Sequence, residues 1–379
     1  MLLTVTLAFR LENMREQHMT ATIDPKLAAL DRDKVHALID RALADLGATV
    51  TTAMISIGDR VGLFKGLADG GPATPAELAE RTGTAERYVR EWLPAVAAGG
   101  YAEYDPESGR FSLSPEQEAA LANESAPFRM AGGFESVLAA IRAEPMIAER
   151  FRTGDGLAWN EHDPRLFEGT ERFFGGLYTS FLVGTWIVAL DGVQAKLESG
   201  ARVADVGCGH GASTILMAQA FPASTFAGFD SHAASIDRAT EAAAEAGVSD
   251  RVSFEVAGAD AFAGDGYDLI THLDCLHDMG DSLAAARQTR AALAEDGTWM
   301  IVEPRAGDRI EENLNPIGRL SYGMSTLICT PHALSETGES ALGGQAGEAR
   351  IRSLAEAAGF RRFQRASESP LNFVYEARP

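Results

Sequence analysis

The sequence predicts an α/β protein in which a doubly wound, mostly parallel sheet follows an all-helical and winged-helix N-terminal region. Two observations predict this fold class. From Ala201 onward, short apolar runs alternate strictly with helical stretches, which is typical of parallel strands connected by helices. Earlier in the chain, two short helices are followed by a hairpin, which is the element order of a winged helix.

Length and charge limit the function. The chain has 379 residues, enough for two domains, and its formal net charge is −21. Because proteins that bind nucleic acid rely on clustered Lys and Arg, this balance argues against a nucleic-acid partner and favours small neutral or cationic ligands. We expect three domains: a winged-helix dimerisation domain at 24–123, a helical linker or lid at 124–197, and a ligand-binding sheet domain at 198–379.

Cysteines and apolar runs indicate the compartment. The three cysteines are far apart and lack zinc or redox spacing, which predicts a reduced cytoplasmic location and no metal site. There is no apolar run of about 18 residues, and the apolar start Leu2–Phe9 lacks a basic leader, so we expect neither membrane spanning nor secretion. Met19 is an alternative start, and the residues before it would then be a poorly ordered extension.

The N-terminal elements follow from caps and periodicity. Apolar spacing predicts helices from Asp24 to Gly70. Thr74 and Glu77 form a predicted capping box around Pro75, at the start of a helix that Gly83 ends. A second helix and a hairpin complete the winged helix, over Ala85–Ala98, Tyr101–Tyr104 and Arg110–Leu113.

A winged helix often binds DNA, and it can also serve as a dimerisation and lid module. The expected recognition helix carries Glu86 and Glu91 beside Arg87 and Arg90, within an acidic chain. No compact basic face results. We therefore expect the domain to support a homodimer and to bind no nucleic acid.

The segment from Ala126 to about Leu197 is predicted to be helical and rich in aromatic residues. Most such residues form core, but some are expected to cover a ligand and exclude water. Its aromatic residues are Phe128, Phe134, Phe151, Trp159, Phe167, Phe173, Phe174, Tyr178, Phe181 and Trp186.

The sequence predicts five strands and three helices in the last domain. Ligands of such a sheet bind at the carboxyl ends of its strands. The strands are predicted at Val203–Val206, Thr225–Phe229, Val252–Val256, Tyr267–Leu273 and Trp299–Val302, and the helices at Ser213–Ala220, Ala233–Ala246 and Leu283–Leu293.

The first of these strands ends in a glycine-rich turn, Asp205–Gly211, that opens a helix. Gly207, Gly209 and Gly211 let the backbone approach a ligand, with Cys208 between them. A dinucleotide pyrophosphate or S-adenosylmethionine would suit such a loop. Asp205 favours the second, because a carboxylate would repel a pyrophosphate and attract an amino group or a sulfonium.

Acidic residues also end the next strands. Asp230, followed by Ser231, lies where a carboxylate accepts both hydroxyls of a ribose. Asp260 and Ala261 follow the third strand and suit the amino group and ring of adenine. We also assign Asp274, which ends the fourth strand, to the cofactor site.

These motifs, in this order, resemble the class I S-adenosylmethionine-dependent methyltransferases over about Arg202–Gly297. The complete layout resembles the small-molecule O-methyltransferases of plants and actinobacteria. The resemblance implies a Rossmann-like doubly wound sheet of seven mostly parallel strands, S-adenosylmethionine as cofactor, a small-molecule substrate and a homodimer formed through the N-terminal domain.

In the family that this chain resembles, a Leu/Cys-His-Asp-Trp segment supplies the base. His277 and Asp278 match its histidine and aspartate, Met279 replaces the tryptophan, and Glu303 matches a glutamate that orients the base. The family's second glutamate has no match in 343–348, although His332 or Gln345 could substitute. O-methylation is therefore predicted, and methylation of carbon or nitrogen, a non-methylating reaction of S-adenosylmethionine and a transcription regulator stay as alternatives.

Overall fold

In the computed structural model, residue 26 and residues 29–123, 126, 129–336 and 341–379 are described. Contacts divide the chain into two units, one up to Val50 and one from Thr51 onward. Helix α3 (Arg32–Arg60) contributes to both. Residues 1–19 and Phe128 lie outside the described residues, and the predicted domain limits of 24–123, 124–197 and 198–379 stay predictions.

The part of α3 up to Val50 exposes a row of apolar side chains. Ile39, Leu43, Leu46 and Val50 recur every three or four residues, so they lie along one side of the helix. The exposed fraction of Leu43 is 56% and that of Leu46 is 65%. This part of α3 therefore has an apolar stripe that the described residues leave exposed.

The winged helix predicted from the sequence is confirmed. Its core contains Phe64, Leu78, Trp92 and Leu93, all buried. The two strands pair antiparallel, and a further bridge joins Ala73 to Phe111. The elements are α4 (Leu63–Gly70), α5 (Pro75–Thr82), α6 (Glu86–Ala98), β1 (Glu103–Asp105) and β2 (Arg110–Ser112), followed by α7 (Pro115–Leu121).

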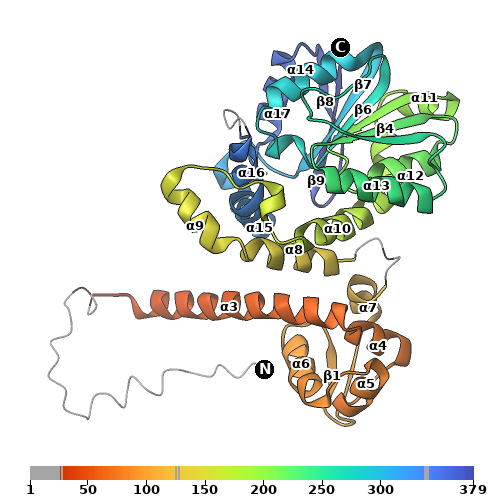
Figure 1. The fold of residues 1–379 in the computed structure, drawn as a ribbon. Coiled ribbons are helices and arrows are strands. Elements are labelled where there is room, and N and C mark those ends of the chain that lie inside the picture. Colours follow the sequence, from red (N-terminus) through yellow and green to blue (C-terminus); the bar gives the residue numbers. More distant parts are fainter. Residues whose placement is uncertain (1–25, 27–28, 124–125, 127–128, 337–340) are drawn as a thin grey trace. The chain divides into compact units, whose positions relative to one another are not determined.

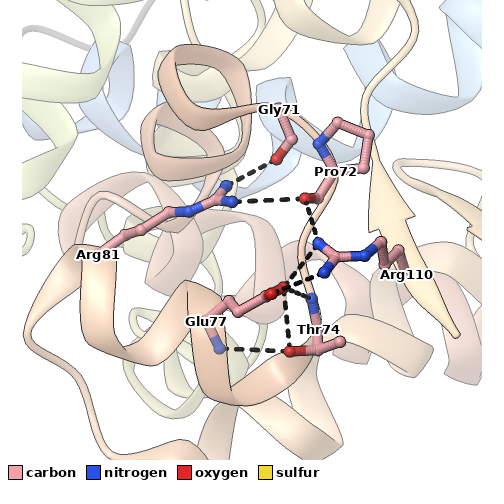
Figure 2. A network of polar contacts seen from close by, with 6 residues as sticks. All are labelled: Gly71, Pro72, Thr74, Glu77, Arg81 and Arg110. Atoms are coloured by element: carbon pink, nitrogen blue, oxygen red, sulfur yellow. Dashed lines mark hydrogen bonds and ion pairs between the residues drawn. The ribbon is translucent and has the colours of Figure 1, made fainter. Parts of the chain in front are cut away.

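The predicted capping box at Thr74 is present and is part of a larger polar network (Figure 2). The backbone N–H of Thr74 donates to the Glu77 carboxylate at 2.8 Å, and the Thr74 hydroxyl accepts from the N–H of Glu77. Arg110 on β2 donates to both oxygens of Glu77, each at 2.7 Å. The carboxylate that starts α5 therefore also fixes the hairpin.

A helical segment follows, as predicted. Gly132 and Gly169 let α8 and α10 pack closely, because a Cβ on Gly132 would lie 2.7 Å from the Gly169 carbonyl oxygen. The elements are α8 (Ala131–Ile141), α9 (Glu144–Thr153), the 3₁₀ turn η1 (Trp159–Glu161), α10 (Arg165–Phe181), the π-helical η2 (Leu182–Ile187) and α11 (Val193–Ser199).

The sheet has seven strands, and its first five run parallel, as the resemblance implied. The strand order is β5-β4-β3-β6-β7-β9-β8. The chain order reverses between β3 and β6, so a ligand cleft is expected at their carboxyl ends. The strands are β3 (Arg202–Val206), β4 (Thr225–Asp230), β5 (Val252–Val256), β6 (Tyr267–Leu273), β7 (Leu293–Pro304), β8 (Arg362–Glu368) and β9 (Asn372–Arg378).

Helices cover both faces of the sheet (Figure 1). One face packs Val203, Leu269 and Met300 under α11, α12 and α13. The other packs their neighbours Ala204, Ile270 and Ile301 under α14 and α17. Alternate strand residues therefore face two separate cores. These helices are α12 (Ala212–Ala220), α13 (Ala233–Glu245), α14 (Ser282–Ala292) and α17 (Glu348–Ala357).

Several short elements connect the strands near their carboxyl ends. None of the helices in the described part of the chain is long and apolar enough to cross a membrane. The short elements are η3 (Leu276–Asp278), η4 (Ile310–Asn313), α15 (Pro316–Met324), the π-helical η5 (Ser325–Cys329) and α16 (Thr330–Ser335).

Candidate active site

The glycine loop after β3 has the backbone that its sequence predicts. The φ angles of Gly207, Gly209 and Gly211 are 76°, 54° and 79°, which L-residues with side chains rarely adopt. The N–H groups of Gly207 and Cys208 donate to the Phe229 carbonyl on β4. The loop therefore turns sharply from β3 into α12 and is anchored to the neighbouring strand.

Asp230 at the end of β4 is held by two backbone groups. Its Oδ2 accepts from the N–H of Gly209 and its Oδ1 from the N–H of His232, both at 2.9 Å. A carboxylate oxygen accepts more than one hydrogen bond, so each keeps capacity for a ligand hydroxyl. The arrangement fits a ribose, because two acceptors lie side by side next to the glycine loop.

Asp205, at the end of β3, has hydrogen-bond partners within the fold. Its side chain is buried and accepts hydrogen bonds from the hydroxyls of Ser213, Thr214 and Thr271 at 2.6, 2.6 and 2.7 Å. Burial raises the pKa of its carboxyl group, against the three hydroxyls that lower it. The carboxylate therefore ties β3 to α12 and β6. Its Oδ1 accepts only one of these three hydrogen bonds, and the role of Asp205 toward the cofactor stays a prediction.

A cavity of about 500 Å³ lies at the carboxyl ends of the strands. Four aromatic residues from the helical segment line it: Trp159, Phe167, Phe174 and Tyr178. Of the residues predicted from the sequence, the cavity is lined by Gly207, Cys208, Gly209, Asp230, Ser231, Asp260, Asp274 and Asp278. Five of the predicted residues are not among those that line the cavity: Asp205, Gly211, Ala261, His277 and Glu303.

His277 and Glu303 form a buried pair. The Nδ1 of His277, on η3, lies 2.7 Å from Oε2 of Glu303 on β7, and the side chains are 6% and 4% exposed. Although burial by itself lowers the pKa of His277, the negative charge of Glu303 and the nearby Cys329 thiol raise it well above 6.5. The geometry is that of an imidazole oriented by a carboxylate.

Asp278 and Asp274 lie on either side of this histidine in the chain. Oδ2 of Asp278 accepts from the indole N–H of Trp159 at 3.3 Å. Oδ1 of Asp274 accepts from the amide of Asn372 at 2.6 Å. Asp274 has a φ of 54° and is the one non-glycine residue with positive φ among those described. Strain of this kind is typical of functional sites.

Two of the cavity residues, Glu171 and Glu336, carried no signal in the sequence, whereas His332 was predicted there as a substitute for the missing glutamate. Glu171, on α10, lies 2.7 Å from Nδ1 of His210 in the glycine loop. His332 and Glu336 also line the cavity, and Oε2 of Glu336 accepts from the N–H of Gly280 at 2.7 Å. Gln345 is not among the lining residues, and its amide donates to the Gly344 carbonyl. No group of His, Cys, Asp and Glu in the described part of the chain could hold a metal ion.

Comparisons with known proteins match two separate segments of the chain. Residues 49–123 match the sequence model of the Rv2258c-like winged helix-turn-helix domain, and residues 197–359 match that of a methyltransferase domain. A curated relative, 27-O-demethylrifamycin SV methyltransferase of Amycolatopsis mediterranei (strain S699), is 28% identical over 183 residues, which are 48% of this chain. These residues span 54% of the relative, so about half its length is matched.

Solved structures show the same fold. The mitomycin 7-O-methyltransferase MmcR is similar over 92% of this chain and 100% of its own, with a TM-score of 0.69 at 20% identity. Human N-acetylserotonin methyltransferase, in complex with S-adenosylmethionine, is similar over 92% and 98%, with a TM-score of 0.69 at 15% identity. The chain thus has the fold of these structures, in which a winged-helix domain precedes a domain that matches a methyltransferase model.

Proposed function

We propose that this protein is a methyltransferase that uses S-adenosylmethionine to methylate a hydroxyl group of a small molecule. Aromatic molecules are among the acceptors that we propose. The observation that carries the proposal is that the glycine loop and Asp230 meet at one cavity, with the His277–Glu303 pair beside it. The match of residues 197–359 to a methyltransferase domain supports it independently.

The residues present fit the cofactor. The two acceptor oxygens of Asp230 suit ribose hydroxyls, and the open side of Gly209, where a Cβ would meet nothing within 4 Å, leaves room for a ligand. Asp260 and Ser231 would border the adenosine, and the N-terminus of α12 would receive the methionine carboxylate. When bound, S-adenosylmethionine supplies an electrophilic methyl group on a sulfonium.

The chain's own residues then orient the acceptor and remove its proton. Trp159, Phe167 and Tyr178 exclude water from the reacting groups. Glu303 holds Nδ1 of His277, so Nε2 is the nitrogen that receives the proton of the acceptor hydroxyl, and Glu303 stabilises the resulting imidazolium. His277 does not line the cavity in this structure. Its chain neighbours Cys275 and Asp278 do line the cavity.

A second candidate function rests on the observation that His277 does not line the cavity. Methylation of carbon or nitrogen, or a non-methylating reaction of S-adenosylmethionine, needs no base in contact with the acceptor. A transcription regulator is less favoured, because Arg87 and Arg90 on α6 are each paired with a glutamate, so the helix has no net positive face from these residues.

We also propose a homodimer formed through the N-terminal domain, because the apolar stripe on α3 needs a partner surface. The free thiols of Cys208, Cys275 and Cys329 support a reduced, cytoplasmic location.

Cofactor binding is the first test. Calorimetric titration of the purified full chain with S-adenosylhomocysteine, S-adenosylmethionine and NAD should give micromolar binding of the first two and none of NAD. An acceptor screen would then detect a methylated product together with S-adenosylhomocysteine. Binding of NAD alone would overturn the proposed function.

A further inference from the structure

The cavity is acidic to an unusual degree. Its described lining includes seven carboxyl groups and three imidazoles, and neither lysine nor arginine. Two of the carboxyl groups have a partner within the fold that accounts for their position: Glu171 lies against His210, and Asp281 caps α14 by accepting from the N–H of Ala284. The remaining five are Asp230, Asp260, Asp274, Asp278 and Glu336.

The cofactor balances only part of this charge. Asp230 and Asp260 lie at the end that suits ribose and adenine, which carry no charge. S-adenosylmethionine is a net monocation, since its sulfonium and ammonium outweigh one carboxylate. Three acidic side chains, Asp274, Asp278 and Glu336, therefore face the rest of the cavity without a lysine or arginine there to offset them.

These three groups have unused acceptor capacity. The Oδ2 atom of Asp274 is buried and has no hydrogen-bond partner among the described residues. Asp278 has one donor, the indole of Trp159, and Oε1 of Glu336 lies 3.7 Å from Nε2 of His332. Burial raises the pKa of Asp274 and of Asp278, because the charged carboxylate is poorly solvated there. A bound cation would relieve that cost.

Aromatic rings complete this end of the cavity. The ring of Trp159 lies 5.5 Å from that of Phe167 and 6.1 Å from that of His332, measured between centroids. An ammonium group is stabilised by the face of an indole as well as by carboxylates. An anionic group there would be repelled by whichever of these carboxyl groups are ionised.

Building on the proposed function, we infer that the methyl acceptor is an aromatic amine-bearing molecule whose ammonium group lies among Trp159, Asp278 and Glu336, and that carboxylated or phosphorylated acceptors are excluded. Asp278 and Glu336 are then specificity-determining residues. The reaction that supplies this acceptor must leave its amine free.

The test uses three catechols that differ only at the end of a two-carbon chain: 3,4-dihydroxyphenylethylamine, 3,4-dihydroxyphenylethanol and 3,4-dihydroxyphenylacetic acid. Each is titrated by calorimetry into the full chain saturated with S-adenosylhomocysteine. We expect the amine to bind about tenfold more tightly than the alcohol, and the acid more weakly than either. The inference is overturned if the acid or the alcohol binds as tightly as the amine. It is also overturned if the amine shows no saturable binding.

Matched variants separate specificity from folding. Glu336→Gln should bring the amine to within about twofold of the alcohol while the affinity for S-adenosylhomocysteine is unchanged. Glu198→Gln removes an exposed charge on α11, before β3, and should preserve the preference. A preference that survives in Glu336→Gln assigns the selectivity elsewhere and contradicts the role of Glu336. If S-adenosylhomocysteine itself does not bind, the proposed function fails, and the inference with it.

Discussion

The Nδ1 atom of His277 and the Oε2 atom of Glu303 lie 2.7 Å apart across the ends of two neighbouring strands. His277 follows β6 and Glu303 lies near the end of β7, so the parallel pairing of these strands brings the two side chains together. The second oxygen of Glu303 is buried and has no partner among the described residues. The carboxylate is therefore committed to the imidazole.

Replacing Glu303 with Gln should lower kcat by about 10- to 100-fold, because the amide neither orients the imidazole as firmly nor stabilises its charged form. The affinity for S-adenosylhomocysteine should change little. Steady-state kinetics with the acceptor found by screening, and calorimetry, measure both. Glu295→Gln, an exposed position on the same strand, is the control. Equal losses in kcat and in cofactor affinity would show that Glu303 acts by holding the fold.

The reaction should become faster as the pH rises. His277 must be neutral to accept a proton, and Glu303 and Cys329 raise its pKa above 6.5. We therefore expect kcat/KM to increase with pH, with a midpoint above 6.5. The stability from this ion pair is fully present below the unfolded pKa and is lost as pH rises through the folded pKa. A flat profile would favour carbon or nitrogen methylation, which needs no base.

Asp230 should decide cofactor affinity. In Asp230→Ala the ribose hydroxyls lose their acceptors and Gly209 loses its anchor, so the Kd of S-adenosylhomocysteine should rise about 100-fold. Calorimetry measures it. Asp237→Ala, at an exposed position on α13, should leave Kd unchanged. An Asp230→Ala protein that binds normally would remove the ribose assignment.

Glu77 should stabilise the winged helix in a way that depends on pH. Hydrogen bonds from the backbone of Thr74 and from Arg110 lower its pKa from 4.5 to about 2. Its contribution is present above 4.5 and is lost as pH falls through about 2. Glu77→Gln should lower Tm at neutral pH, and the difference should shrink in acid. Glu80→Gln, exposed on the same helix, should not change Tm.

The apolar stripe on α3 should control the oligomeric state. A charge in the middle of a buried dimer contact is costly, so Leu43→Asp should convert a dimer into a monomer, as measured by size-exclusion chromatography with light scattering. Arg41→Glu, on the same helix, is the matched control. A dimer that persists in Leu43→Asp would place the contact outside α3.

The sequence predicted the first five strands because each has an apolar run bounded by turn residues. It missed β8 and β9. β8 is an edge strand whose residues, from Arg362 to Glu368, are mostly exposed, so apolar alternation is absent. β7 begins at Leu293 instead of Trp299, because Leu293 pairs with Tyr267 on β6. The polar residues between Leu293 and Thr298 lie at an irregularity in the pairing and have no strand pattern of their own.

In the site, the residues found from the sequence are those with a motif: the glycines, Asp230 and the His277 segment. The partners that place them lie far away in the chain. Trp159 is 119 residues from Asp278, Asn372 is 98 from Asp274, and Glu171 is 39 from His210. Such pairs arise only when the elements pack. The orientation of Asp205 was also unreadable, because its three hydroxyl partners come from two other elements.

The left-handed backbone of Asp274 sets a limit on how stable this protein can become. A residue with a Cβ at φ 54° costs of order 1 kcal/mol or more, which glycine would not incur. Selection for heat resistance alone would therefore favour Asp274→Gly and would remove the carboxylate from the cavity at the same time. The backbone relief that glycine would give and a carboxylate in the lining of the cavity are therefore alternatives at this single position.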